Sequence, residues 1–111
     1  MEYASGLIQL RIGTEEKVQE WRKTIVSRLN EAAETLQNEE VKVESWFKVE
    51  IQGENYLLWY LRAKSIQHVF EVSMQLKHPI DKFHYELMAE ITADNGNILA
   101  EPLIDINKDK Q

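Results

Sequence analysis

Hydrophobic and polar residues alternate most regularly between positions 41 and 63, in the stretch VKVESWFKVEIQGENYLLWYLRA. From 41 to 51 the period is two, which is the period of a β-strand whose side chains point alternately to its two faces. Residues 52–55 (QGEN) supply a turn, and the aromatic-rich segment 56–63 follows as a second strand. The stretch therefore predicts a β-hairpin.

The segment before the hairpin combines a strand with a long helix. Apolar and polar residues alternate over 5–12, and Gly13 and Thr14 end that pattern. Apolar residues then recur at spacings of three and four from Val18 to Leu36, which trace one face of a helix. We therefore expect a single helix over residues 14–38, with Thr14 as its N-cap.

The segment after the hairpin predicts a second helical region and a last strand. Ser65 can cap a helix that Pro79 ends or kinks near Lys77, because proline removes a donor and clashes with the preceding turn. A further helical run follows over 80–91, residues 94–97 (DNGN) predict a turn, and 102–106 (PLIDI) predict a short strand. A helix-capping role is expected for His78, as a cation near a helix C-terminus.

The order of these elements, β-α-β-β-α-β, predicts a ferredoxin-like α+β plait with a four-stranded antiparallel sheet. The first and third strands are the most apolar and should be central. The second strand carries alternating charges and the fourth opens with proline, and both features are typical of edge strands. We expect one domain over residues 1–106 and a polar tail over 107–111.

Helices should cover one face of this sheet and leave the other open. The face expected beneath the helices carries Ile8, Leu10, Ile12, Phe47, Val49 and Ile51. A turn centred on residues 53–54 would pair residue 46 with 61 and 48 with 59, and this register predicts an open face with Gln9, Arg11, Glu44, Trp46, Leu57, Trp59, Leu61 and Asp105. A β-bulge would exchange Trp59 for Tyr60 and Arg62. Exposed tryptophans usually mark a contact surface, so we expect a second copy to cover this face and form a homodimer around a shared cavity.

Composition narrows the possible partners. The net charge of −6 argues against nucleic acid or an anionic membrane as the main partner, because both require a concentrated basic surface. The chain has no cysteine, which excludes disulfides and thiolate metal sites and suits the cytoplasm. No apolar run approaches the roughly 20 residues of a membrane span.

Candidate chemistry is sparse. Glu44, Trp46 and Lys48 share one strand face, which indicates either the wall of a ligand pocket or the seam of a dimer. The residues predicted to bind a ligand are Gln9, Arg11, Glu44, Trp46 and Trp59. His84 and Glu44 are candidates for acid–base catalysis. The three histidines form no i, i+4 pair, so we predict no metal site and no cofactor.

The long capped helix, the WFKVEI…YLLWYLRA hairpin and the helix interrupted at KHP resemble the dimeric α/β-barrel group of ferredoxin-like proteins. That group includes antibiotic-biosynthesis monooxygenase-like, haem-degrading, sugar-mutarotase and stress-response families. More closely, the whole chain is similar to a functionally uncharacterised bacterial family of about 110 residues. The resemblance implies a homodimer with a pocket in each sheet.

This resemblance leaves several activities open, because fold alone does not name a reaction. Haem-degrading members use an asparagine, a tryptophan and a histidine, where this chain has Gln9, Trp59 or a neighbour, and His84. The histidine and tyrosine constellation of the mutarotases has no counterpart that can be placed here. We therefore expect a small homodimer that binds a small molecule or serves a structural role without catalysis. The alternatives are a cofactor-free monooxygenase or isomerase acting on a small hydrophobic substrate, and a haem-binding or haem-degrading protein.

Overall fold

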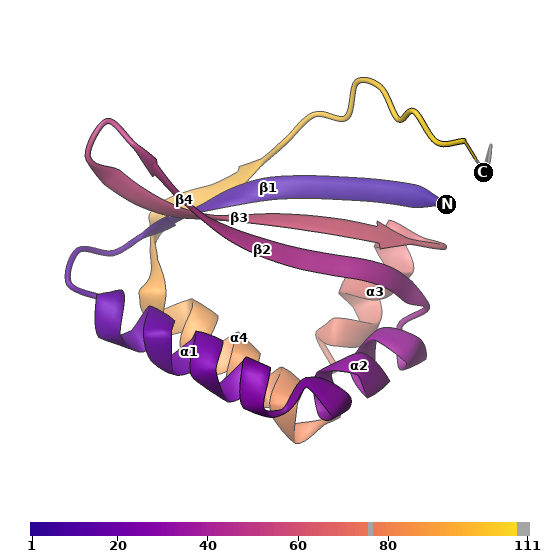
Figure 1. The fold of residues 1–111 in the computed structure, drawn as a ribbon, viewed down its shortest axis with the longest axis horizontal. Coiled ribbons are helices and arrows are strands. Elements are labelled where there is room, and N and C mark those ends of the chain that lie inside the picture. The colour runs from indigo at the N-terminus through magenta and orange to yellow at the C-terminus, as the bar shows by residue number, and fades with distance from the viewer. Residues whose placement is uncertain (76, 109–111) are drawn as a thin grey trace.

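A computed structural model describes residues 1–75 and 77–108 of the chain. One antiparallel sheet lies above a layer of helices, and the end of the chain runs over the other side of the sheet (Figure 1). The elements are β1 (Glu2–Leu10), α1 (Glu15–Ser27), α2 (Leu29–Asn38), β2 (Val41–Ile51), β3 (Glu54–Ala63), α3 (Ile66–Ser73), α4 (Pro79–Ile91) and β4 (Thr92–Leu99). The predicted ferredoxin-like α+β fold is confirmed. Leu76 and residues 109–111 of the predicted tail lie outside the described residues.

The strand order is β2-β3-β1-β4, so the first and third strands are central, as predicted. The hairpin turn is the two residues Gln52 and Gly53, because Ile51 pairs directly with Glu54. Both turn residues have positive φ, at 51° and 80°, as a type I′ turn requires. Trp46 consequently pairs with Trp59 rather than with residue 61.

The last strand differs from the prediction. β4 spans Thr92–Leu99 and includes the DNGN segment predicted as a turn, whereas residues 102–106 lie outside any strand. The register of β4 against β1 shifts between Ile8 and Leu10, and Asn95 has a φ of 56°. The segment predicted as a turn is therefore an irregularity within the strand, and Asn95 adopts the positive φ there.

The predicted long helix is two helices that meet at Arg28, whose φ of −124° is not helical. Both segments contact α4, and the break lets α2 pack on β2 as well. Ser65 caps α3 as predicted by accepting from the His68 N–H at 3.3 Å. His78 also caps a helix, but at the N-terminus of α4, where its Nδ1 accepts from the Ile80 N–H at 3.2 Å. It acts there as an acceptor rather than as the predicted C-terminal cation.

The two faces of β2 and β3 are opposite to the prediction. Ile8 and Leu10 lie beneath the helices as expected, but so does Leu57, which is 2% exposed. Phe47 and Ile51, predicted to be covered, are 54% and 41% exposed on the open face. Pairing with β1 sets this orientation, because Ile8 lies opposite Leu57. The main core comprises Ile8, Leu10, Val18, Trp21, Leu57, Leu87 and Ile91, with Trp46 and Trp59 packed against it.

Gly6 shows why Trp59 can lie on the covered face. Gly6 is opposite Trp59 in the β1–β3 ladder. A Cβ atom at Gly6 would be 2.8 Å from Trp59 Nε1 and 2.8 Å from the Ile98 carbonyl oxygen. Glycine therefore leaves the space that the indole occupies.

Candidate functional site

Two tryptophans and a histidine form an aromatic cluster between the sheet and the helices: Trp21 on α1, Trp46 on β2 and His84 on α4. Trp21 Nε1 donates a hydrogen bond to His84 Nδ1 at 2.9 Å. The ring centroids of Trp46 lie 5.2 Å from Trp21 and 5.5 Å from His84, in edge-to-face geometry. Both contacts are within the range of favourable aromatic pairs, so the three rings position one another.

The hydrogen bond from Trp21 also defines the protonation of His84. A ring nitrogen that accepts a hydrogen bond carries no proton, so the neutral ring has its hydrogen on Nε2. Burial lowers the pKa of His84, and the nearby negative charge of Glu44 only partly opposes this effect. His84 is therefore a neutral imidazole at neutral pH, with Nε2–H as a potential donor.

Three carboxyl groups lie near this cluster: Glu39 at the end of α2, Glu44 on β2 and Asp81 on α4. Glu44 accepts a hydrogen bond from Trp46 Nε1 at 2.8 Å. Burial raises the pKa of Glu39 to about 7, and repulsion from Asp81 and Glu44 adds to the effect. The pKa of Asp81 is also raised, mainly by burial, with Glu44 adding to the rise and His78 opposing it. The region is thus negative, and one of its carboxyl groups titrates near neutral pH.

A pocket of about 350 Å³ opens at the hairpin end of the sheet, farther along β2 and α1 than the aromatic cluster, whose own side chains do not line it. Its wall includes Lys48, which is two residues from Trp46 on the same face of β2, and Val18, which is one helical turn from Trp21. Its other lining residues are Leu10, Arg11, Ile12, Thr14, Glu15, Gln19, Gly53, Glu54 and Asn55. The volume is in the range of small-molecule sites. The helix-covered face of β2 therefore carries, in chain order, the Glu44 carboxylate, the Trp46 indole and the Lys48 ammonium group, which lines the pocket.

The structure brings some of the predicted site residues together and separates others. Glu44, Trp46 and His84 meet at the cluster, on the covered face rather than on the predicted open one. Trp59 lies opposite Trp46 in the ladder and contacts the ring of Phe70, with centroids 6.3 Å apart.

The remaining predicted residues lie elsewhere. Gln9 is on the open face, where its amide donates to Glu54. Arg11 lines the pocket and pairs with Asp94 at 3.3 Å. Asp105 is over the open face as predicted, but it follows β4 rather than belonging to a strand.

Sequence reasoning missed three residues of the site. Trp21 belongs to the core, as the apolar helical face between Val18 and Leu36 predicts, but its role in the site was not foreseen. No motif marks Glu39 or Asp81. One signal was available for Trp21, because a buried indole N–H needs an acceptor and a histidine is a suitable one. Across residues 1–75 and 77–108, no group of three or more histidine, aspartate or glutamate side chains is arranged to hold a metal ion. In the same part of the chain, no helix is both long and apolar enough to cross a membrane.

Comparison with known proteins identifies the family. Residues 1–111 match a family of unknown function (DUF6176), and the chain belongs to that family. No curated protein matches the chain. Among solved structures, the chain is similar to L-rhamnose mutarotase from Formosa agariphila, with 17% identity and a TM-score of 0.60 over 96% of this chain and 100% of that one. This similarity shows a shared fold.

Proposed function

We propose that this member of a family of unknown function is a homodimer that binds a small, polar ring-shaped molecule on the helix-covered side of each subunit. The observation that carries the proposal is the cluster of Trp21, His84, Trp46 and Glu44, joined by hydrogen bonds from both indoles. The pocket at the hairpin end of the sheet provides space for a ligand of this size. Subunit association would use the open face of the sheet, where Phe47 and Ile51 are exposed.

The chemistry of the cluster favours a hydroxylated ring. Indole faces pack against the C–H bonds of such a ring, while carboxylates and the His84 Nε2–H can bond its hydroxyl groups. The fold is shared with an enzyme that acts on L-rhamnose, which makes a monosaccharide the first ligand to test.

An isomerase is the second candidate function, and the titration of the site supports it. Interconversion of sugar anomers moves one proton to the ring oxygen and another from the anomeric hydroxyl group. Groups with a pKa close to the working pH are the most effective acids and bases. Glu39, with a pKa of about 7, meets this condition, and the neutral His84 adds an Nε2–H that can donate a hydrogen bond.

The test compares wild-type protein with His84→Ala. Ligand-observed NMR with L-rhamnose should show binding to the wild type, and magnetisation transfer between the two anomers should show any catalysis. Binding should weaken in His84→Ala, because a donor and one ring of the cluster are removed. His68→Ala is the matched control, since His68 is exposed on α3 and should behave as wild type.

Each outcome has a separate meaning. Faster anomer exchange that depends on His84 supports the isomerase, and binding without exchange supports a binding protein. No binding by any of a panel of monosaccharides contradicts the proposed ligand class. Native mass spectrometry tests the assembly, for which we expect twice the chain mass of 13.1 kDa.

A further inference from the structure

We infer that the segment after β4, residues 100–106, is a strap that packs against a second copy of this chain and forms part of the dimer interface. The inference rests on the homodimer proposed above and adds the segment that holds it together. Residues 100–106 are called the strap below.

The strap is anchored at both ends to its own subunit. At the start, the Ala100 N–H donates to the Ser5 carbonyl oxygen at 2.9 Å. Near the other end, Asp105 forms a two-pronged ion pair with Arg62 of β3, at 2.6 and 3.1 Å. Arg62 is itself oriented by Tyr60, whose hydroxyl oxygen accepts from Arg62 Nε at 2.8 Å. These contacts direct the strap over the side of the sheet away from the helices (Figure 1).

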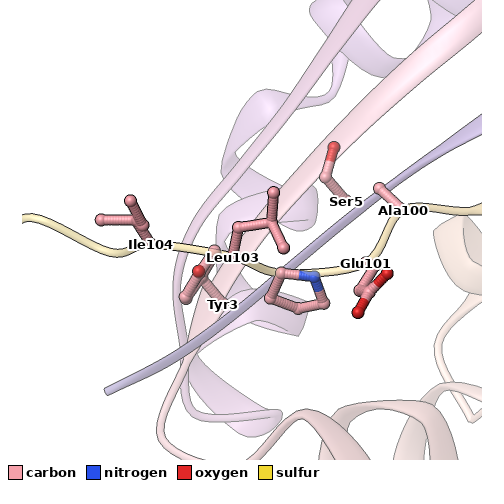
Figure 2. A pocket seen from close by; sticks show the side chains of 7 residues that line it. Tyr3, Ser5, Ala100, Glu101, Leu103 and Ile104 are labelled. Carbon is pink, nitrogen blue, oxygen red and sulfur yellow. The ribbon is translucent and has the colours of Figure 1, made fainter.

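Between and beyond these anchors, the strap presents apolar side chains to solvent. Leu103, Ile104 and Ile106 are 83%, 76% and 92% exposed. The strap crosses β1 beside Tyr3 and Ser5 (Figure 2), and together they border a groove of about 320 Å³. If this segment faced only solvent, we would expect it to carry polar side chains. Three large aliphatic side chains on an anchored backbone are instead typical of an interface.

The accessible surface of the chain is larger than that of a compact monomer of the same mass. A compact monomer of this mass would expose about 6,400 Å², from the scaling of surface with mass. The chain exposes 7929 Å². The excess of roughly 1,500 Å² is larger than the 800 Å² or so that each partner buries in a standard interface.

A second copy fits the chemistry of this surface. In a two-fold dimer the same patch faces itself, so the patch has to be self-complementary. The open face of the sheet, over which the strap runs, also exposes Phe47, Ile51 and Ile98, so apolar surface would meet apolar surface. The charges of Arg62 and Asp105 neutralise each other within one subunit. This pairing matters because each chain carries a net charge of −6, and two copies repel each other unless their contact is nearly neutral.

The test is sedimentation velocity over a range of protein concentrations. The triple variant Leu103→Ser, Ile104→Ser, Ile106→Ser should raise the dimer dissociation constant about 30-fold or more, the effect typical of losing an interface hot spot. Asp105→Asn should give a smaller increase, because it loosens an anchor and keeps the apolar side chains. The control is Val26→Ser, Leu29→Ser, which removes two aliphatic side chains that are 58% and 57% exposed on the helical side.

The outcomes separate the inference from the proposed function. A wild-type dimer that the triple variant weakens and the control does not would support the strap. A wild-type dimer that the triple variant leaves unchanged would overturn the strap alone. A wild-type monomer at all concentrations would overturn the homodimer and the strap together, and would leave ligand binding in each subunit as a separate question. Far-ultraviolet circular dichroism checks that every variant is folded.

Discussion

Replacing Glu39 with glutamine should remove a pH-dependent loss of stability. Glu39 is 5% exposed, and its carboxyl group has a pKa of about 7 in the folded chain, against an ordinary value of 4.5. At a pH between these two pKa values, the Glu39 carboxyl group holds a proton in the folded state and has released it in the unfolded state. The free energy of unfolding therefore falls as the pH rises from 4.5 to about 7, and the loss is complete above that range.

The size of the effect follows from the two pKa values. Each unit between them is worth about 1.4 kcal/mol, so the full difference corresponds to roughly 3 kcal/mol. Solvent near the site screens part of the charge, and we expect an observed effect of about 1 to 2 kcal/mol. Glutamine has nearly the same shape and no charge. The variant should therefore equal the wild type near pH 4 and be more stable by this amount near pH 8.5.

Urea unfolding at both pH values measures the difference directly. Both conditions lie away from the sequence pI of 5.1, so the protein is charged and soluble. Glu50→Gln is the matched control, because Glu50 is exposed on β2 and its replacement should change stability by less than about 0.5 kcal/mol at either pH. If the gain from Glu39→Gln is the same at both pH values, the folded chain does not protonate Glu39 and the reasoning is wrong.

Three further changes test other parts of the structure. Gly6→Ala should cost about 1 to 3 kcal/mol in chemical unfolding and alter Trp59 fluorescence, because the added Cβ would meet the indole at 2.8 Å; unchanged fluorescence would contradict the close approach. His84→Ala should cost about 1 to 3 kcal/mol by leaving the buried Trp21 N–H without its acceptor, and equal stability of the variant would argue against that hydrogen bond. Ser65→Ala should cost about 1 kcal/mol through loss of the α3 cap, and a thermal midpoint unchanged from the wild type would rule that cap out.

Much of the fold could be predicted because local signals and topology agree. The Ser65 cap is found where the sequence places it, and a hairpin turn that includes Gly53 is found as well, because both depend on the chemistry of nearby residues. Pro79 begins α4, but α3 already ends at Ser73 rather than near Lys77. The central and edge strands also follow from composition, since charges on β2 protect an edge.

The covered face of the hairpin could not be predicted, because both faces of β2 carry apolar side chains. Alternation shows that Trp46 and Phe47 point in opposite directions, but it does not show which of them meets the helices. The pairing of Ile8 with Leu57 decides that question, and it is a contact between residues far apart in the sequence. β4 was missed for a related reason, since Asn95 and Gly96 are as suitable for an irregular strand as for a turn.

The same dependence on distant contacts explains the outcome for the site. Glu44 and Trp46 could be recognised as a pair from their spacing on one strand. Their meeting with His84 and Trp21 depends on how α1 and α4 pack, which no local pattern records. Glu39 resembles any exposed acidic residue in the sequence, and only burial gives it an unusual pKa.

The connection between α4 and β4 has a mechanical consequence. Ile91 ends the helix and Thr92 begins the strand, so no loop separates them. The Arg11 N–H bonds the Ile91 carbonyl oxygen at 2.8 Å, and the Thr92 hydroxyl group donates to the Met88 carbonyl oxygen at 2.6 Å. The helix that carries His84 therefore runs into the strand that leads to residues 100–106 without a loop, and the irregular segment around Asn95 is the first place where the backbone departs from regular pairing. A tilt of that helix would consequently displace Thr92 and the start of β4 directly.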